Sequence, residues 1–207
     1  MIVPEERIMS VFVIGPSHIH ASILSASDRD RYYGDVKLEA HPGIPVWSSR
    51  ILEALQEHAA LGMRIVWIVS DWKLNNSDYN VIKNDGCPTL FIETLGRKGN
   101  VASNYSSPMH IETLAQHAMR CIDRVIEILP EVRLIFWCLY KRTRTTDASS
   151  YPIGAQYKSM VSRYAQNVID IDEFTTPSDF NTRLTVDSGG HPSSAGQAVL
   201  SSMILSR

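Results

Sequence analysis

Short apolar runs alternate along the chain with longer segments in which apolar residues recur every three or four positions. Runs rich in branched and aromatic residues that end at a turn-forming residue indicate buried strands. Such runs occupy residues 7–14, 36–40, 64–69, 132–139 and 167–171. The third and fourth runs contain hardly any polar residue, which is typical of strands that are covered on both faces.

The segments between these runs have the period of helices. The clearest helix has its apolar residues on one face over 111–129, with Ser107 and Pro108 at its start and Pro130 ending it. Further helices are predicted over 45–61, 151–165 and 193–205. Gly62 follows the first of them as a C-terminal cap. Because parallel neighbouring strands need crossover connections, the pattern predicts a three-layer α/β/α sandwich with a five-stranded parallel, flavodoxin-like sheet.

Length and composition favour one domain over 1–207, because compact domains usually hold about 100–200 residues. The chain is 44% hydrophobic and 20% charged, so it can bury a core. Its 20 basic and 22 acidic residues give a net charge of -2, and no global basic field draws it to nucleic acid or an anionic membrane. Without a basic, apolar leader or a run of about 18 apolar residues, the chain is expected to be cytoplasmic.

Residues 72–108 are irregular and rich in asparagine and glycine, with one apolar island at 89–95. Connections longer than about 15 residues are uncommon in compact domains. We interpret this segment either as a loop insertion that closes over a substrate or as a plain structural excursion.

The three cysteines, Cys87, Cys121 and Cys138, are odd in number and show no CxxC spacing. This spacing favours free thiols in a reducing compartment over a disulfide framework or a zinc site.

Chemically useful residues follow the predicted strands. In an open parallel sheet, ligands bind beyond the carboxyl ends of the strands. Ser17 follows the first strand, and Asp187 and His191 precede the last helix. A serine, a histidine and an aspartate supply a nucleophile, a base and an orienting carboxylate. Alternatively, Ser17 is a helix N-cap, His191 a surface loop residue and Asp187 a turn residue.

The segment Gly15-Pro16-Ser17-His18, together with the late segment from Asp187 to His191 before Pro192 and a helix, resembles the SGNH (GDSL-like) hydrolase superfamily. The resemblance follows the whole chain in order. It implies serine hydrolysis or acyl transfer without a cofactor, with Ser17 as nucleophile, His191 as base and Asp187 as orienter. It also implies an oxyanion hole formed by the Ser17 N–H, the Gly43 N–H and an asparagine.

Three features depart from the family pattern. Pro16 stands where the family has an aspartate, and the asparagine block has no clean counterpart, so Asn75 is a substitute candidate. Asp187 and His191 are separated by three residues instead of two, and the two glycines between them would have to tighten the turn. These departures leave open a weakly active or inactive protein of this fold that binds glycans.

The expected substrate is an acyl ester of a carbohydrate, although no single sequence feature identifies it. Arg142 and Arg144 follow the fourth predicted strand, where they could bind an anionic group or form a solvated loop. His18, Asp71 and Trp72 follow the first and third strands, and Trp72 could stack on a sugar ring or pack in the core. The expected partner is therefore a small-molecule or glycan ester, with no nucleic acid and no membrane, and the oligomeric state is left open.

A metal-dependent hydrolase is the alternative mechanism. His18 and His20 could seed a metal site, which further side chains elsewhere could complete. The possible additional ligands are His41, Asp71, His110 and His191. Residues two apart on a helical turn point away from each other, which disfavours this site. The GxSxG elbow of the α/β-hydrolases, the P-loop and the GxGxxG motif are all absent from the sequence.

Overall fold

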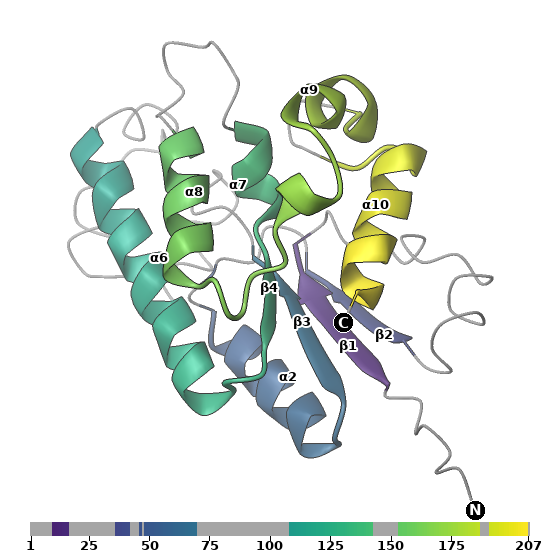
Figure 1. The fold of residues 1–207 in the computed structure, drawn as a ribbon. Helices are drawn as coiled ribbons and strands as arrows, with labels where there is room; N and C mark the ends of the chain where they lie inside the picture. Colours follow the sequence, from purple (N-terminus) through teal and green to yellow (C-terminus); the bar gives the residue numbers. More distant parts are fainter. Residues whose placement is uncertain are drawn as a thin grey trace, which may run out of the picture.

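Parallel strands form a sheet at the centre of the protein (Figure 1). The structure is a computed structural model that describes residues 10–16, 36–41, 46, 48–69, 108–142, 153–186 and 191–206. In this part of the chain the strands are β1 (Val11–Gly15), β2 (Val36–Ala40), β3 (Arg64–Ile68) and β4 (Arg133–Ile135). Their order is β2-β1-β3-β4, and every neighbouring pair is parallel. The predicted parallel sheet is therefore confirmed for four strands.

The fifth predicted strand, 167–171, is reduced to a single parallel bridge between Val168 and Leu134 of β4. The Leu134 N–H donates to Asn167 O and the Ile169 N–H donates to Leu134 O, both at 2.9 Å. The chain then turns into the short helix η2 (Ile171–Glu173). The segment lies where the flavodoxin-like order requires its last strand, but one bridge replaces the predicted ladder.

Helices cover both faces of this sheet, as the sequence predicts. Phe12 of β1 stacks on His58 of α2 (Ser49–Ala60), with ring centroids 3.7 Å apart. Arg64 of β3 donates from its side chain to backbone carbonyls at the C-terminal end of α10 (Ser194–Leu205). Arg64 lies opposite the residue before Phe12 in the sheet register, so the two side chains point to opposite faces. Helices α2 and α10 therefore form the two outer layers.

The other predicted helices are present with shifted ends. Helix α6 (Pro108–Ile128) begins at Pro108, as predicted, and ends before Pro130, whereas α8 (Ile153–Arg163) is shorter than predicted. Gly62 follows α2 with φ +75°, the left-handed conformation of a C-terminal glycine cap. None of the helices in the described ranges combines the length and the hydrophobicity needed to cross a bilayer.

The prediction of one strand over 132–139 is wrong. Only β4 is extended, and α7 (Trp137–Arg142) begins two residues after it. Leu134 to Tyr140 are all buried, and a fully buried run is continuously apolar whether it forms a strand or a helix. Arg142 is consequently the last residue of a helix and does not lie in a loop directly after the fourth strand.

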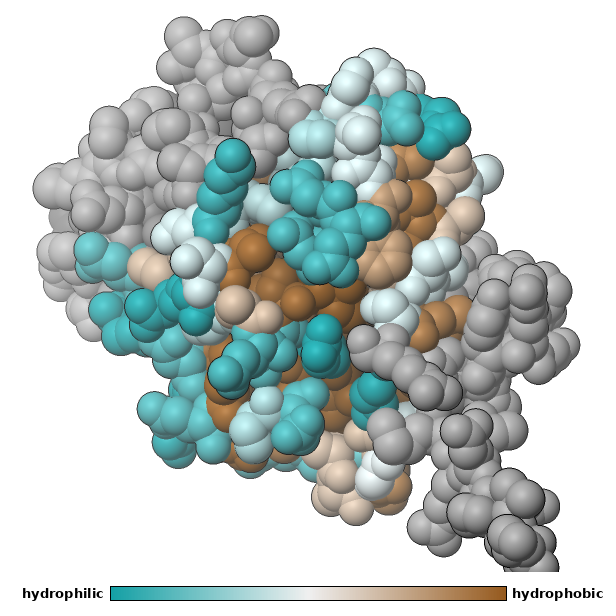
Figure 2. Space-filling view, in the orientation of Figure 1, coloured by the Kyte–Doolittle hydropathy of each residue, from teal (hydrophilic) through white to brown (hydrophobic). Residues whose placement is uncertain are grey.

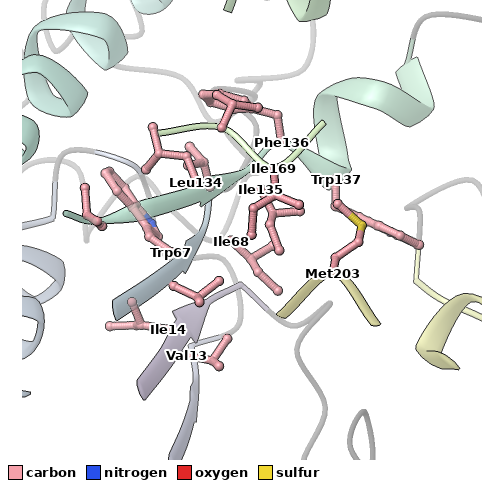
Figure 3. Packing of buried hydrophobic residues seen from close by; sticks show 14 of the residues in the cluster. Val13, Ile14, Trp67, Ile68, Leu134, Ile135, Phe136, Trp137, Ile169 and Met203 are labelled. Carbon is pink, nitrogen blue, oxygen red and sulfur yellow. The ribbon is translucent and has the colours of Figure 1, made fainter. Parts of the chain in front are cut away.

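The hydrophobic core joins the sheet to α7 and α10. In Figure 3, Met203 of α10 lies beside Trp137, and both side chains are fully buried. Trp137 also packs on Phe180, with ring centroids 4.6 Å apart. Figure 2 shows hydrophobic residues emerging at the centre of one face, framed by hydrophilic residues. This packing holds the late part of the chain against the carboxyl end of β4.

Of the cysteines, Cys121 in α6 is a free thiol whose pKa is raised by burial. Cys138 is buried in α7, and Cys87 lies outside the described residues. The predicted loop insertion at 72–108 also lies outside them, apart from Pro108 itself, which begins α6.

Candidate active site

Two of the predicted site residues lie in the described part of the chain. His191 is half-buried just before α10, and Arg142 ends α7. The remaining predicted residues lie outside it: Ser17, His18, Gly43, Asp71, Trp72, Asn75, Arg144 and Asp187. The site can therefore be built from the segments that lead into these positions.

The end of β1 marks one side of the candidate site. Gly15 is the last residue of the strand, and the buried Pro16 follows it. His41, directly after β2, donates its backbone N–H to Gly15 O at 2.9 Å. The two strands thus stay paired to their carboxyl ends, and the chain leaves β1 at the edge of the sheet where α/β proteins bind ligands.

The start of α10 marks the other side. Arg64, at the beginning of β3, contacts the last carbonyls of α10, so the helix ends near the amino edge of the sheet. The 12 residues of α10 span about 18 Å and a strand of five residues spans about 16 Å. Figure 1 shows α10 running antiparallel to β1. His191, three residues before α10, therefore lies toward the same carboxyl edge as Gly15.

A short antiparallel pairing surrounds residues 187–190. The Val186 N–H donates to His191 O at 2.9 Å, and Thr185 forms an antiparallel bridge with Pro192. Val186 is 67% exposed. Val186 and His191 are thus held together by this pairing, and Val186 is the residue before Asp187.

A group of tyrosines and aspartates near the same edge was not predicted. The Tyr157 hydroxyl donates to Asp170 Oδ1 at 2.7 Å and accepts from the Ile171 N–H at 2.9 Å. The Tyr140 hydroxyl donates to Asp172 Oδ1 at 2.5 Å. Burial, and next the hydrogen bond to Asp170, raise the pKa of Tyr157, which keeps its phenol protonated. Asp170 lies within the fifth predicted strand and Asp172 directly follows it, but that pattern alone identifies no partner for either aspartate.

The described residues give no support to the alternative metal site. There, no group of three or more His, Cys, Asp or Glu side chains lies close enough to hold a metal ion. His41 Nε2 lies 3.5 Å from Glu39 Oε2, and His110 belongs to α6. His18, His20 and Asp71 lie outside the described residues.

A solved structure has a similar fold. It is the crystal structure of a member of the lipolytic protein G-D-S-L family from Veillonella parvula DSM 2008. The match covers 95% of this chain and 96% of that chain, with a TM-score of 0.50 and 12% sequence identity. No protein-family model matches the sequence, and no curated protein matches it. The chain therefore has the α/β fold of a GDSL-family protein, as the sequence resemblance implies.

Proposed function

We propose that the chain is an SGNH-type serine esterase or O-acyltransferase that acts on an acyl or acetyl ester of a carbohydrate. The observation that supports it most is the shared fold with a lipolytic GDSL-family protein over 95% of the chain. Fold alone does not imply function, so the position of His191 is the second support. His191 precedes α10 at the edge of the sheet where β1 ends two residues before Ser17.

In this mechanism the Ser17 hydroxyl attacks the acyl carbonyl carbon while His191 accepts its proton. Asp187 orients the imidazole and stabilises the imidazolium. The Ser17 and Gly43 N–H groups and the Asn75 side chain stabilise the oxyanion of the tetrahedral intermediate. His191 then protonates the leaving alcohol, and water or a sugar hydroxyl takes the acyl group from Ser17.

Substrate recognition in this proposal uses residues around the same edge. His18, Asp71 and Trp72 contact the sugar, with Trp72 stacking on its ring. Arg142 and Arg144 bind an anionic group of the substrate. The inactive glycan-binding protein is the competing function, because the family's oxyanion asparagine has no clean counterpart in the sequence.

The test is hydrolysis of a small activated acyl ester, p-nitrophenyl acetate. Ser17→Ala should abolish the activity of the wild type and leave Tm nearly unchanged, because a nucleophile stabilises the transition state and not the core. Ser202→Ala is the matched control, since Ser202 is exposed and its hydroxyl donates within α10 to Ala198 O. Full activity in Ser17→Ala would contradict the proposal, and an inactive wild type would favour the glycan-binding protein.

A further inference from the structure

Ser193 makes more hydrogen bonds than a helix cap requires. Its hydroxyl accepts from the Gly196 N–H at 3.1 Å, which is the ordinary N-cap bond of α10. The same hydroxyl donates to Arg183 O at 2.6 Å, and the Ser193 N–H donates to Leu184 O at 2.8 Å. Ser193 therefore joins the start of α10 to the segment ten residues earlier in the chain.

That earlier segment is itself held in place. Arg183 and Leu184 close η3 (Phe180–Leu184), which has π-helical hydrogen bonding. The Phe180 ring packs on Trp137 at 4.6 Å and on Tyr140 at 4.7 Å, both in α7. The carbonyls that receive the two Ser193 hydrogen bonds thus belong to an element that is anchored in the core.

The two segments also touch through Gly196. A Cβ atom at this position would clash with Leu184 O, so a glycine is required for the approach. His191 lies two residues before Ser193, and its carbonyl accepts from the Val186 N–H. The backbone of His191 is consequently fixed on one side by Val186 and on the other by the bonds of Ser193.

We infer that Ser193 is a positioning residue that holds His191 in place through the hydrogen bond from its hydroxyl to Arg183 O. The inference rests on the proposed function, in which His191 is the catalytic base. Ser193 does not touch the substrate. It acts by fixing the backbone from which the imidazole reaches the reacting atoms, and small displacements of such a group lower the rate by as much as about 100-fold.

Three substitutions separate this role from helix capping. Ser193→Ala removes both the accepted and the donated hydrogen bond. Ser193→Asp keeps an acceptor for the Gly196 N–H, but an ionised carboxylate cannot donate to Arg183 O. Ser193→Thr keeps both. Thr176→Ala is the matched control, because Thr176 caps α9 (Pro177–Asp179) by accepting from the Asp179 N–H.

Two readouts are measured on each variant. The first is kcat and KM for p-nitrophenyl acetate: Ser193→Ala and Ser193→Asp should lower kcat about tenfold with little change in KM, and Ser193→Thr should restore kcat. The second is the set of imidazole NMR signals of His191, assigned by their loss in His191→Gln. These signals should broaden or split in Ser193→Ala and Ser193→Asp, and stay single in Ser193→Thr and Thr176→Ala.

The possible results distinguish a positioning role of Ser193 from helix capping. If the His191 signals are unchanged in both Ser193→Ala and Ser193→Asp, the inference is wrong. It is also wrong if kcat falls in Ser193→Ala but not in Ser193→Asp, because that result would indicate helix capping alone. A wild type without turnover refutes the proposed function. The His191 signals then still decide whether Ser193 positions that side chain.

Discussion

At the scale of single residues, two glycines are required for different reasons. Gly62 has open space around it but a φ of +75°, a conformation that side chains other than asparagine and aspartate rarely adopt. Gly196 lies inside α10, where Leu184 O leaves no room for a Cβ atom. Gly62 is therefore required by its backbone conformation, and Gly196 is required by the close contact between α10 and Leu184.

We predict that Gly196→Ala destabilises the protein by about 1–3 kcal/mol, because the added methyl group overpacks against Leu184. The sign of this change in stability is informative, since alanine in place of glycine within a helix normally stabilises a protein by about 0.5–1 kcal/mol. Urea unfolding followed by circular dichroism measures the difference. Gly62→Asn is the comparison and should be nearly neutral. A higher unfolding midpoint in Gly196→Ala would show that Leu184 does not approach so closely.

At the scale of elements, hydrogen bonds that involve two tyrosine hydroxyls connect α7 and α8 to the end of the fifth predicted strand and the residue after it. Tyr157 of α8 reaches Asp170 and Ile171, and Tyr140 of α7 reaches Asp172. The two rings also touch each other at 4.9 Å in an edge-to-face arrangement. These contacts explain how a segment with one bridge to β4 is held beside the sheet.

We predict that Tyr157→Phe lowers the free energy of unfolding by about 1–3 kcal/mol, because the buried Ile171 N–H loses its acceptor. Tyr164→Phe is the matched control. The Tyr164 hydroxyl donates to Asp123 Oδ1 and accepts from Arg163, whose guanidinium keeps its ion pair with Asp123 at 2.7 Å. Tyr164→Phe should therefore lower the free energy of unfolding less than Tyr157→Phe does. Equal losses of stability in the two variants would argue against a special role of Tyr157.

The same variant has a pH signature. The pKa of Tyr157 is raised in the folded protein, first by burial and then by Asp170, so the folded state holds the phenolic proton more tightly than the unfolded state. This contribution to stability is complete below about pH 10, the ordinary tyrosine pKa, and is lost as the pH rises above it. Urea midpoints measured between neutral and alkaline pH should fall less steeply in Tyr157→Phe than in the wild type.

At the scale of the whole molecule, the proposed serine mechanism takes its nucleophile from a side chain and not from a metal-bound water. We predict that EDTA leaves the esterase activity unchanged and that the purified protein contains no stoichiometric zinc or manganese, as measured by elemental analysis. Loss of activity on chelation, restored by adding back the metal, would contradict the serine mechanism. It would favour the alternative site seeded by His18 and His20.

The sequence by itself determined the elements whose signals are local. The run at 36–40 forms β2 with the predicted bounds, and Ile51 and Leu55 of α2 face the core as their spacing indicates. Gly62 ends α2 because the left-handed conformation favours glycine at any helix end. The parallel order followed from the alternation of strands and helices. Ser17 and Asp187 stay predictions, and His191 is found before α10 with its role still to be measured.

Only the tertiary structure decided the features that depend on distant partners. The run at 132–139 is divided between β4 and α7, which the sequence pattern does not show because every residue of the run except Arg133 is buried, and burial removes the periodicity that distinguishes a strand from a helix. The partners of Tyr157 lie 13 and 14 residues away, and the carbonyls bound by Ser193 belong to η3. Hydrogen bonds between such segments leave no pattern in the sequence, because a tyrosine or a serine is compatible with many partners until the fold brings one of them within reach.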